Sequence, residues 1–213
     1  MFESKELITH NNPKSAISEA YRVLRTNIQY SSIDKPLKTI VVTSSGPGEG
    51  KTTTIVNMGI AFAQSGSKVI IIDADLRKPK IHKLFGMDNK RGLSNMLVAH
   101  EDYKSYLNKC EVDNLHVITC GVKPPNPSEL LSTKAMRQFI EKVSADYDFV
   151  FIDSPPVGTV TDAAILSTEV DGTILVVSSG LVDDKALVRS KELLDKVNAN
   201  IIGVVLNLSL IHI

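Results

Sequence analysis

The sequence predicts an α/β fold, with a doubly wound, mostly parallel sheet that carries helices on both faces. Three observations lead to this prediction. Apolar runs of strand length alternate with segments of helical periodicity, an order typical of parallel β-α-β units. The runs themselves are almost uniformly apolar, which indicates strands covered on both faces. A glycine-rich loop at residues 46–52 joins the first run to a helix, so we expect the P-loop NTPase type of this fold.

The composition is that of one domain covering residues 1–213. Of the 213 residues, 43% are hydrophobic, which is enough for one sizeable core. Lysine and arginine (24 together) balance aspartate and glutamate (24 together), so we expect no nucleic-acid partner. The sequence contains no run of about 18 apolar residues and no apolar signal-peptide core. We therefore expect a cytoplasmic protein that reaches a membrane only through a partner.

The first expected element is an amphipathic helix over residues 14–30. Its apolar positions recur at helical spacing, which predicts one buried face. These positions are Ile17, Tyr21, Leu24 and Ile28. A polar turn follows, and residues 39–42 then predict a buried strand that leads into the glycine-rich loop.

The helix that begins at Lys51 is expected to end at residues 65–67, and a second strand at residues 68–72 completes a parallel unit. Later apolar runs, separated by helical stretches, bring the expected sheet to about six strands. These runs cover residues 115–118, 149–152, 173–177 and 201–206. A proline-rich loop at residues 121–127 precedes a helix that should start near Ser128.

The glycine-rich loop carries the residues expected to bind a nucleotide. Backbone amides at a helix N-terminus bind phosphate oxygens, the loop lysine reaches the β- and γ-phosphates, and the following hydroxyl binds Mg²⁺. The residues in these positions are Gly48, Glu49, Gly50, Lys51, Thr52 and Thr53. Ser45 stands where the strict pattern has glycine, so the flanking strand and helix support the assignment. We expect ATP and Mg²⁺ as cofactors.

Acidic residues end two of the predicted strands. Asp73 and Asp75 follow one strand and Asp153 follows another, at the edge of a parallel sheet where ligands bind. In phosphoryl transfer, carboxylates orient or deprotonate the nucleophile and place the metal ion. We predict the first role for Asp73 and Asp75, unless they only cap the next helix. We predict metal binding for Asp153 together with Thr52.

Three residues allow more than one interpretation. Arg77 is expected to pair with Asp75, to contact a phosphate or to form a surface ion pair. Asp162 is close enough in sequence to reach the site, but we favour a solvated acid or a helix cap. Asn207 ends the last predicted strand, where its amide either contacts an adenine edge or occupies a turn. We include Asn207 among the nucleotide ligands.

Four segments resemble the cytoplasmic catalytic domain of the bacterial tyrosine kinases that regulate capsular and extracellular polysaccharide synthesis. They are EAYRVLRTN at 19–27, SSGPGEGKTT at 44–53, IIDADLR at 71–77 and GVKPPNPSELL at 121–131. The resemblance covers nearly the whole chain, and it is specific because the Asp-x-Asp-x-Arg motif accompanies the Pro-Gly-Glu form of the loop. It implies an ATP-dependent protein-tyrosine kinase and autokinase that regulates polysaccharide synthesis and export.

The resemblance also implies roles for the site residues. Lys51 would hold phosphates and act in catalysis, Asp73 would activate the tyrosine hydroxyl, and Asp75 would support the metal shell and the catalytic step. Thr52 and Asp153 would place Mg²⁺. These roles agree with those expected from the residues alone.

The same resemblance makes residues 14–30 an oligomerisation helix. Glu19, Arg22 and Arg25 would join subunits into a ring, so that the tyrosine tail of one subunit enters a neighbour's site. From the residues alone, the alternative of a surface helix with an i, i+3 ion pair that contributes about 0.2–0.5 kcal/mol stays open.

The resemblance further implies a separate transmembrane adaptor that recruits the kinase to the inner face of the membrane, and protein substrates such as sugar-nucleotide dehydrogenases. One departure concerns the tail. Family members usually end in a tyrosine-rich segment, whereas no tyrosine follows Tyr147. We favour a truncated reading frame over a member that modifies only other proteins.

The main alternative is an ATPase switch of the same fold, such as those that place division septa or partition plasmids. Those ATPases carry a signature lysine early in the loop, where this chain has Gly46. The Asp-x-Asp-x-Arg motif is an addition to their pattern. A weakly catalytic scaffold that uses ATP only for assembly is a second alternative.

Overall fold

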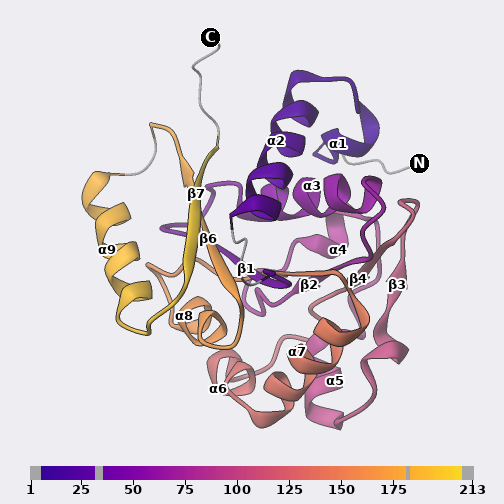
Figure 1. Ribbon diagram of the computed structural model, residues 1–213. Helices are drawn as coiled ribbons and strands as arrows, with labels where there is room; N and C mark the ends of the chain where they lie inside the picture. The colour runs from indigo at the N-terminus through magenta and orange to yellow at the C-terminus, as the bar shows by residue number, and fades with distance from the viewer. Residues whose placement is uncertain (1–5, 32–35, 181–182, 208–213) are drawn as a thin grey trace.

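A computed structural model describes residues 6–31, 36–180 and 183–207 (Figure 1). Its centre is a seven-stranded sheet in the order β3-β4-β2-β5-β1-β6-β7. Every pair of neighbouring strands is parallel except β3 and β4 at one edge. Helices lie on both faces of the sheet. The predicted α/β fold, a doubly wound and mostly parallel sheet, is therefore confirmed.

The strands follow the apolar runs of the sequence. They are β1 (Thr39–Ser44), β2 (Val69–Asp73), β4 (Leu115–Ile118), β5 (Phe149–Asp153), β6 (Gly172–Ser178) and β7 (Ile201–Asn207). The expectation of about six strands missed β3 (Asn108–Lys109). This edge strand has two polar residues and gives no apolar signal in the sequence.

Helices α1 to α4 cover one face of the sheet (Figure 1). They are α1 (Ile8–Asn11), α2 (Ala16–Tyr30), α3 (Lys51–Gln64) and α4 (Ile81–Leu84). Helix α3 is buried along most of its length and lies close to β2. A Cβ at Gly59 would come within 2.6 Å of the end of the Ile71 side chain, so a larger residue here would displace that side chain.

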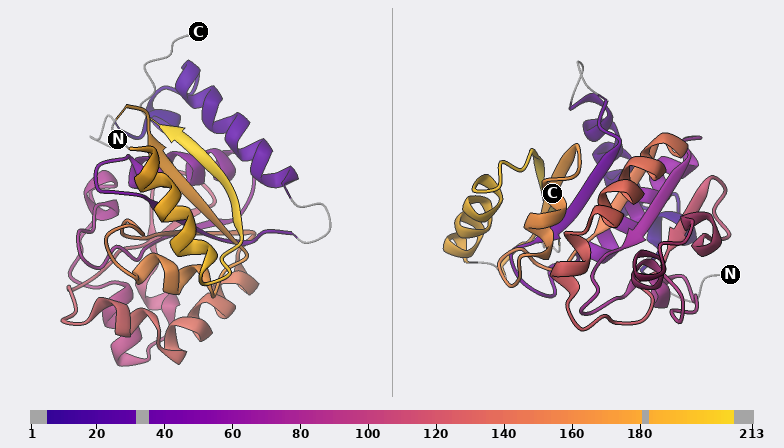
Figure 2. Two further views of the ribbon diagram at one scale, coloured as in Figure 1. Left: turned by 90° about the vertical axis from the view of Figure 1, so that its left-hand side faces the viewer. Right: turned by 90° about the horizontal axis from the view of Figure 1, so that it is seen from below.

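The opposite face is covered by α5 and by the helices that follow it in the chain. They are α5 (Leu93–Ala99), the 3-10 helix η1 (Tyr103–Tyr106), α6 (Pro127–Leu131), α7 (Lys134–Asp146), α8 (Asp162–Ser167) and α9 (Asp184–Asp195). Helix α9 lies beside the outer strands β6 and β7, as both views in Figure 2 show. Side chains of each inner strand alternate between the two faces. In β1, for example, Val42 packs in the cluster under α3 and Val41 in the cluster under α7.

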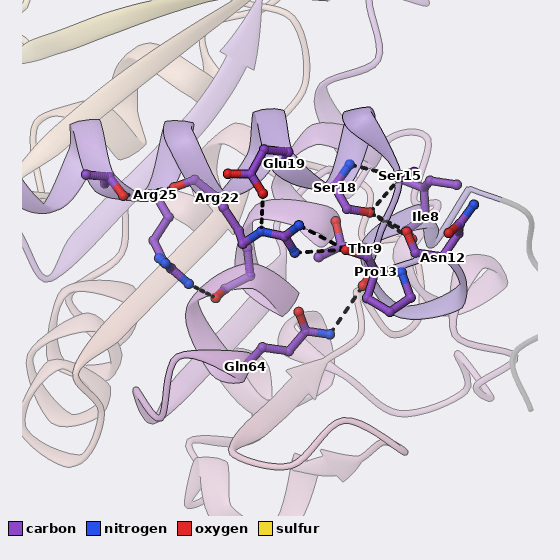
Figure 3. Close-up of polar contacts among 12 residues, drawn as sticks. Ile8, Thr9, Asn12, Pro13, Ser15, Ser18, Glu19, Arg22, Arg25 and Gln64 are labelled. Carbon is purple, nitrogen blue, oxygen red and sulfur yellow. Dashed lines mark hydrogen bonds and ion pairs between the residues drawn. The ribbon is translucent and has the colours of Figure 1, made fainter.

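The segment predicted as a helix over residues 14–30 begins at Ala16, because Ser15 is its N-cap. The Ser15 hydroxyl accepts a hydrogen bond from the Ser18 amide at 3.1 Å, which satisfies a free donor of the first turn. The Ser18 hydroxyl donates to the Asn12 carbonyl at 2.7 Å. These contacts hold α1 against the start of α2 (Figure 3).

Candidate active site

The phosphate-binding loop connects the end of β1 to the start of α3. Gly50 is the N-cap of α3 and has φ 84°, a left-handed conformation that favours glycine. A Cβ at Gly50 would also collide with the Asn207 side chain. The first bond of the helix runs from the Thr54 amide to the Gly50 carbonyl at 2.8 Å. The amides of residues 51–53 therefore have no helical acceptor and form a site for an anion.

Glu49 fixes the conformation of this loop. Its side chain is buried, and its carboxylate accepts hydrogen bonds from the amides of Gly46 and Ser178, the latter at 3.2 Å. Its carbonyl accepts a bond from Asn207 Nδ2 at 3.1 Å. The loop is thereby joined to the ends of β6 and β7. Sequence reasoning missed this role of the Glu49 side chain, because its partner Ser178 lies 129 residues away in the sequence.

Lys51 forms an ion pair with Asp75, and the distance from Nζ to Oδ2 is 3.1 Å. Both side chains are largely buried, with exposed fractions of 12% and 4%. Burial alone lowers the pKa of Lys51, but nearby carboxylates, Asp153 first among them, raise it above its ordinary value. The lysine therefore stays charged inside the site.

Asp73 and Asp153 occupy the same register position on the adjacent strands β2 and β5. Both are fully buried. Burial raises the pKa of Asp73 well above its usual range, and the proximity of Asp153 raises it further. Burial also raises the pKa of Asp153, opposed chiefly by Lys51 and by the Thr52 hydroxyl. The site thus concentrates carboxylates that a cation must neutralise.

Two buried carboxylate oxygens of the site are free to bind a ligand. Oδ1 of Asp73 and Oδ1 of Asp153 have no hydrogen-bond partner in the described part of the chain. The second oxygen of Asp153 accepts a bond from the Thr52 hydroxyl at 2.8 Å. Carboxylate and hydroxyl oxygens are the ligands that Mg²⁺ prefers, so Thr52 and Asp153 fit a magnesium ion, and the free oxygen of Asp73 is left to accept a proton. Asp75 differs, because its two oxygens already bind Lys51 and the Lys78 amide.

Arg77 and Asp162 form a pair that the sequence interpretation missed. The Arg77 guanidinium donates two hydrogen bonds to the Asp162 carboxylate, each at 2.9 Å. The Asp162 side chain has an exposed fraction of 0%, so the favoured interpretation as a solvated acid is wrong. The alternative of a helix cap is not met either, because the N-cap of α8 is Thr161. The pair suggested between Arg77 and Asp75 does not form. Instead, Arg77 links the segment after β2 to α8, which follows β5.

The α2 side chains expected to join subunits make contacts within their own chain (Figure 3). Arg22 Nε lies 2.7 Å from Glu19 Oε2, and the Arg22 guanidinium also donates to the Pro13 carbonyl at 3.0 Å. Arg25 donates to the Ala61 carbonyl on α3 at 2.9 Å. The local i, i+3 ion pair is therefore present. The structure contains one chain, so a ring remains a prediction.

A cavity of about 690 Å³ opens above the loop, a volume within the usual range of ligand sites, about 300–1,000 Å³. Its lining combines the phosphate-binding loop with α1, α2, α4 and the end of β7. Beyond the loop, its lining includes Ile8, Ile17, Tyr21, Lys80, Lys83 and Leu84. Asn207 also lines this cavity, so it lies next to the site where we predict nucleotide binding.

Known proteins share this architecture and much of this sequence. Residues 36–213 match the family described as "ParA: NUBPL iron-transfer P-loop NTPase". The chain is 41% identical over 203 residues to the tyrosine-protein kinase YwqD of Bacillus subtilis, covering 95% of this chain and 86% of that protein. The chain belongs to the bacterial tyrosine-protein kinases. As a P-loop kinase of this family, it binds ATP.

Comparison with solved structures supports the same fold and family. The crystal structure of the chimerical protein CapA2B2 superposes with a TM-score of 0.93 at 39% identity, covering 98% of the kinase and 92% of that chain. The cell division ATPase MinD of Pyrococcus furiosus gives a TM-score of 0.67 at 24% identity, which shows a shared fold alone. The alternative of a septum-placement ATPase therefore has only distant support. Within the described residues, no helix of the kinase is long and apolar enough to cross a membrane.

Proposed function

We propose that this protein is an ATP-dependent tyrosine kinase and autokinase that regulates the synthesis and export of capsular or extracellular polysaccharide. Family membership supports tyrosine as the acceptor. The observation that carries the proposal is the meeting of Lys51 with Asp73, Asp75 and Asp153 at one buried edge of the sheet. This arrangement combines a phosphate-binding cation with carboxylates suited to metal binding and proton transfer.

In the proposed site, the amides of residues 48–53 and the Lys51 ammonium bind the phosphates of ATP, while Asn207 lies beside the rest of the nucleotide. Thr52 and Asp153 would hold Mg²⁺, which neutralises charge on the phosphates when bound. Asp75 would join them once Lys51 leaves it for a phosphate, because that movement frees the Asp75 oxygen now bound to Lys51.

Asp73 is the proposed general base. The tyrosine oxygen attacks the γ-phosphorus of ATP, the bond from that phosphorus to the bridging oxygen breaks, and ADP leaves with that oxygen. The phenol proton passes to the free Oδ1 of Asp73. Burial raises the pKa of Asp73, which makes its carboxylate a stronger base than an exposed aspartate.

Purified protein with ATP and Mg²⁺ is expected to place phosphate on tyrosine in a copolymer of glutamate and tyrosine, once the cytoplasmic tail of a membrane adaptor is supplied. Detection with an antibody to phosphotyrosine, alongside measurement of released phosphate, distinguishes transfer to protein from transfer to water. A reaction with the metal chelated serves as the control. Release of free phosphate with no phosphotyrosine would contradict the proposal.

We also infer that residues 1–213 form one kinase domain, that residues 14–30 form an oligomerisation helix, and that a separate transmembrane adaptor brings the kinase to the inner membrane face. Sugar-nucleotide dehydrogenases are proposed as protein substrates. The resemblance of residues 19–27 to the contact motif of this family supports the ring. Exposed apolar side chains on α2, Ile17 and Val23, support a contact surface there.

The ring predicts a specific change in mass. Replacing Arg22 and Arg25 together with alanine is expected to convert the oligomer to monomers, because it removes two cations from the proposed interface. Native mass spectrometry measures this directly, and Arg189→Ala on α9 is a matched control at an exposed arginine. A thermal melt checks that loss of the Arg25 bond to α3 has not unfolded the chain. An unchanged mass in the folded variant would remove both arginines from the interface.

A further inference from the structure

Two lysines of the cavity have no assigned role. Lys80 and Lys83 line it beside Lys51 and the phosphate-binding loop. Both are exposed, and neither forms an ion pair with any residue in the described ranges 6–31, 36–180 and 183–207. Charges left without a partner at the rim of a cavity are suited to an anionic ligand.

The position of these lysines is fixed by the active site itself. Lys80 is the N-cap of α4, and the next amide, that of Ile81, donates to Asp73 Oδ2 at 3.1 Å. Burial raises the pKa of Asp153, and the cations that oppose this rise include Lys51 and Lys80. The Lys80 ammonium is therefore within electrostatic reach of the carboxylates. Lys83 lies one turn further along α4.

Most of the rest of the outer wall is apolar, and the carboxylate that lines it, Glu6, accepts a hydrogen bond from the Thr53 hydroxyl at 2.9 Å. Ile8 from α1, Ile17 and Tyr21 from α2, and Leu84 from α4 line the same cavity. Ile17 has an exposed fraction of 57%, which leaves it available to a ligand. An aromatic ring that enters between these side chains buries its apolar faces. The cavity thus offers an apolar wall for a tyrosine ring, with two cations on one side of it.

We propose that Lys80 and Lys83 select acceptor segments in which acidic residues flank the target tyrosine. This inference rests on the proposed kinase function and names its preferred substrate class. The loop amides and Lys51 provide for the phosphates of the nucleotide, so the two lysines on α4 are the cations left for the acceptor. An acidic flank, whether aspartate, glutamate or a tyrosine already phosphorylated, complements them.

Binding of a labelled peptide tests the inference without any turnover. The peptide carries phenylalanine in place of tyrosine, flanked by three glutamates on each side, and a second peptide has glutamines instead. Fluorescence anisotropy is measured with Mg²⁺ and ADP present. Lys80→Gln combined with Lys83→Gln is expected to weaken binding of the glutamate peptide about fivefold to tenfold, as for two partly exposed ion pairs. Binding of the glutamine peptide and of ADP should not change.

The matched control removes the same charge from the opposite face of the sheet, by Lys134→Gln and Lys142→Gln on α7. A reversed pair, Lys80→Glu with Lys83→Glu, should shift the preference to a lysine-flanked peptide. In kinetic assays with tyrosine present, the neutralised variant should raise KM for the acidic peptide and leave kcat and the KM for ATP unchanged.

Weaker ADP binding with unchanged peptide binding would assign the lysines to the nucleotide and overturn the inference. Equal losses in the α7 control would overturn it too, because they would show a general charge effect. If the proposed kinase function itself were wrong, the result would differ from both of these. In that case the glutamate peptide binds through Lys80 and Lys83, but no tyrosine peptide receives phosphate. Equal phosphorylation of acidic and neutral peptides would leave the kinase function intact and refute the selection.

Discussion

Replacing Lys51 with methionine is expected to reduce tyrosine phosphorylation by about 10²–10³-fold, the scale on which loss of one preorganised charge contact slows a reaction. Methionine keeps the length and apolar body of the side chain but removes the ammonium that faces the phosphates. Phosphotyrosine formation at saturating ATP measures the effect. Activity retained within tenfold would exclude Lys51 from the mechanism.

The same substitution should also lower stability in the absence of nucleotide. Asp75 has an exposed fraction of 4% and loses its ion-pair partner, and an uncompensated buried charge destabilises a fold by about 3–5 kcal/mol. Adding Asp75→Asn removes that charge, so the double variant should recover most of the stability and none of the activity. Urea unfolding of the two variants and the wild type separates the roles of Lys51 in folding and in catalysis.

Replacing Asp73 with asparagine is expected to reduce phosphate transfer to tyrosine about 10²–10⁴-fold, the usual contribution of a general base. Binding of ADP, measured by calorimetry, should stay close to wild type, because the loop amides and Lys51 are unchanged. Asp113→Asn, at an exposed carboxylate outside the site, is the matched control. Wild-type phosphorylation by the Asp73 variant would mean that another group accepts the proton.

The Asp73 substitution should at the same time stabilise the protein when no metal is present. Burial, with the neighbouring Asp153, raises the pKa of Asp73 in the folded state. The ionised carboxylate is therefore less stable when folded than when unfolded, and the penalty applies above the unfolded pKa, including at pH 7.5. Removing this penalty should raise Tm by about 2–4 °C for each kcal/mol of unfolding free energy that is regained. A lower Tm in chelator would show that the carboxylate supports the fold.

The strands were predictable from the sequence because their apolar character reflects burial on both faces. Val41, Ile71 and Phe151 lie in inner strands and are fully buried, and each belongs to a run that indicates a strand without further information. Asn108 and Lys109 pair with β4 at the sheet edge through backbone bonds, joined by one bond from Asn108 Nδ2 to the Val117 carbonyl at 3.2 Å. Such pairing requires no apolar side chain, so no sequence pattern marks it.

The candidate site was predictable as a set of residues but not as a set of contacts. The predicted strand ends placed Asp73 and Asp153 at the same edge of the sheet. Their shared register position was not predictable, because it depends on the strand order, in which β5 lies between β2 and β1. Likewise, Asp162 is buried because Arg77, 85 residues away, supplies two charged donors. A partner at that separation leaves no local signal, so the acid resembled a solvated one.

The contact between Asn207 and the Glu49 carbonyl spans 158 residues of sequence. During synthesis at about 5–20 residues per second, the loop would emerge roughly 8–30 s before the strand that completes it. The Ser178 amide, the second distant partner of Glu49, is also made late. A ribosome-bound chain therefore carries the glycine-rich segment without the bonds that fix its conformation. The nucleotide site should mature only after Asn207 has been made, so that a shorter nascent kinase stays inactive beside its neighbours on the same message.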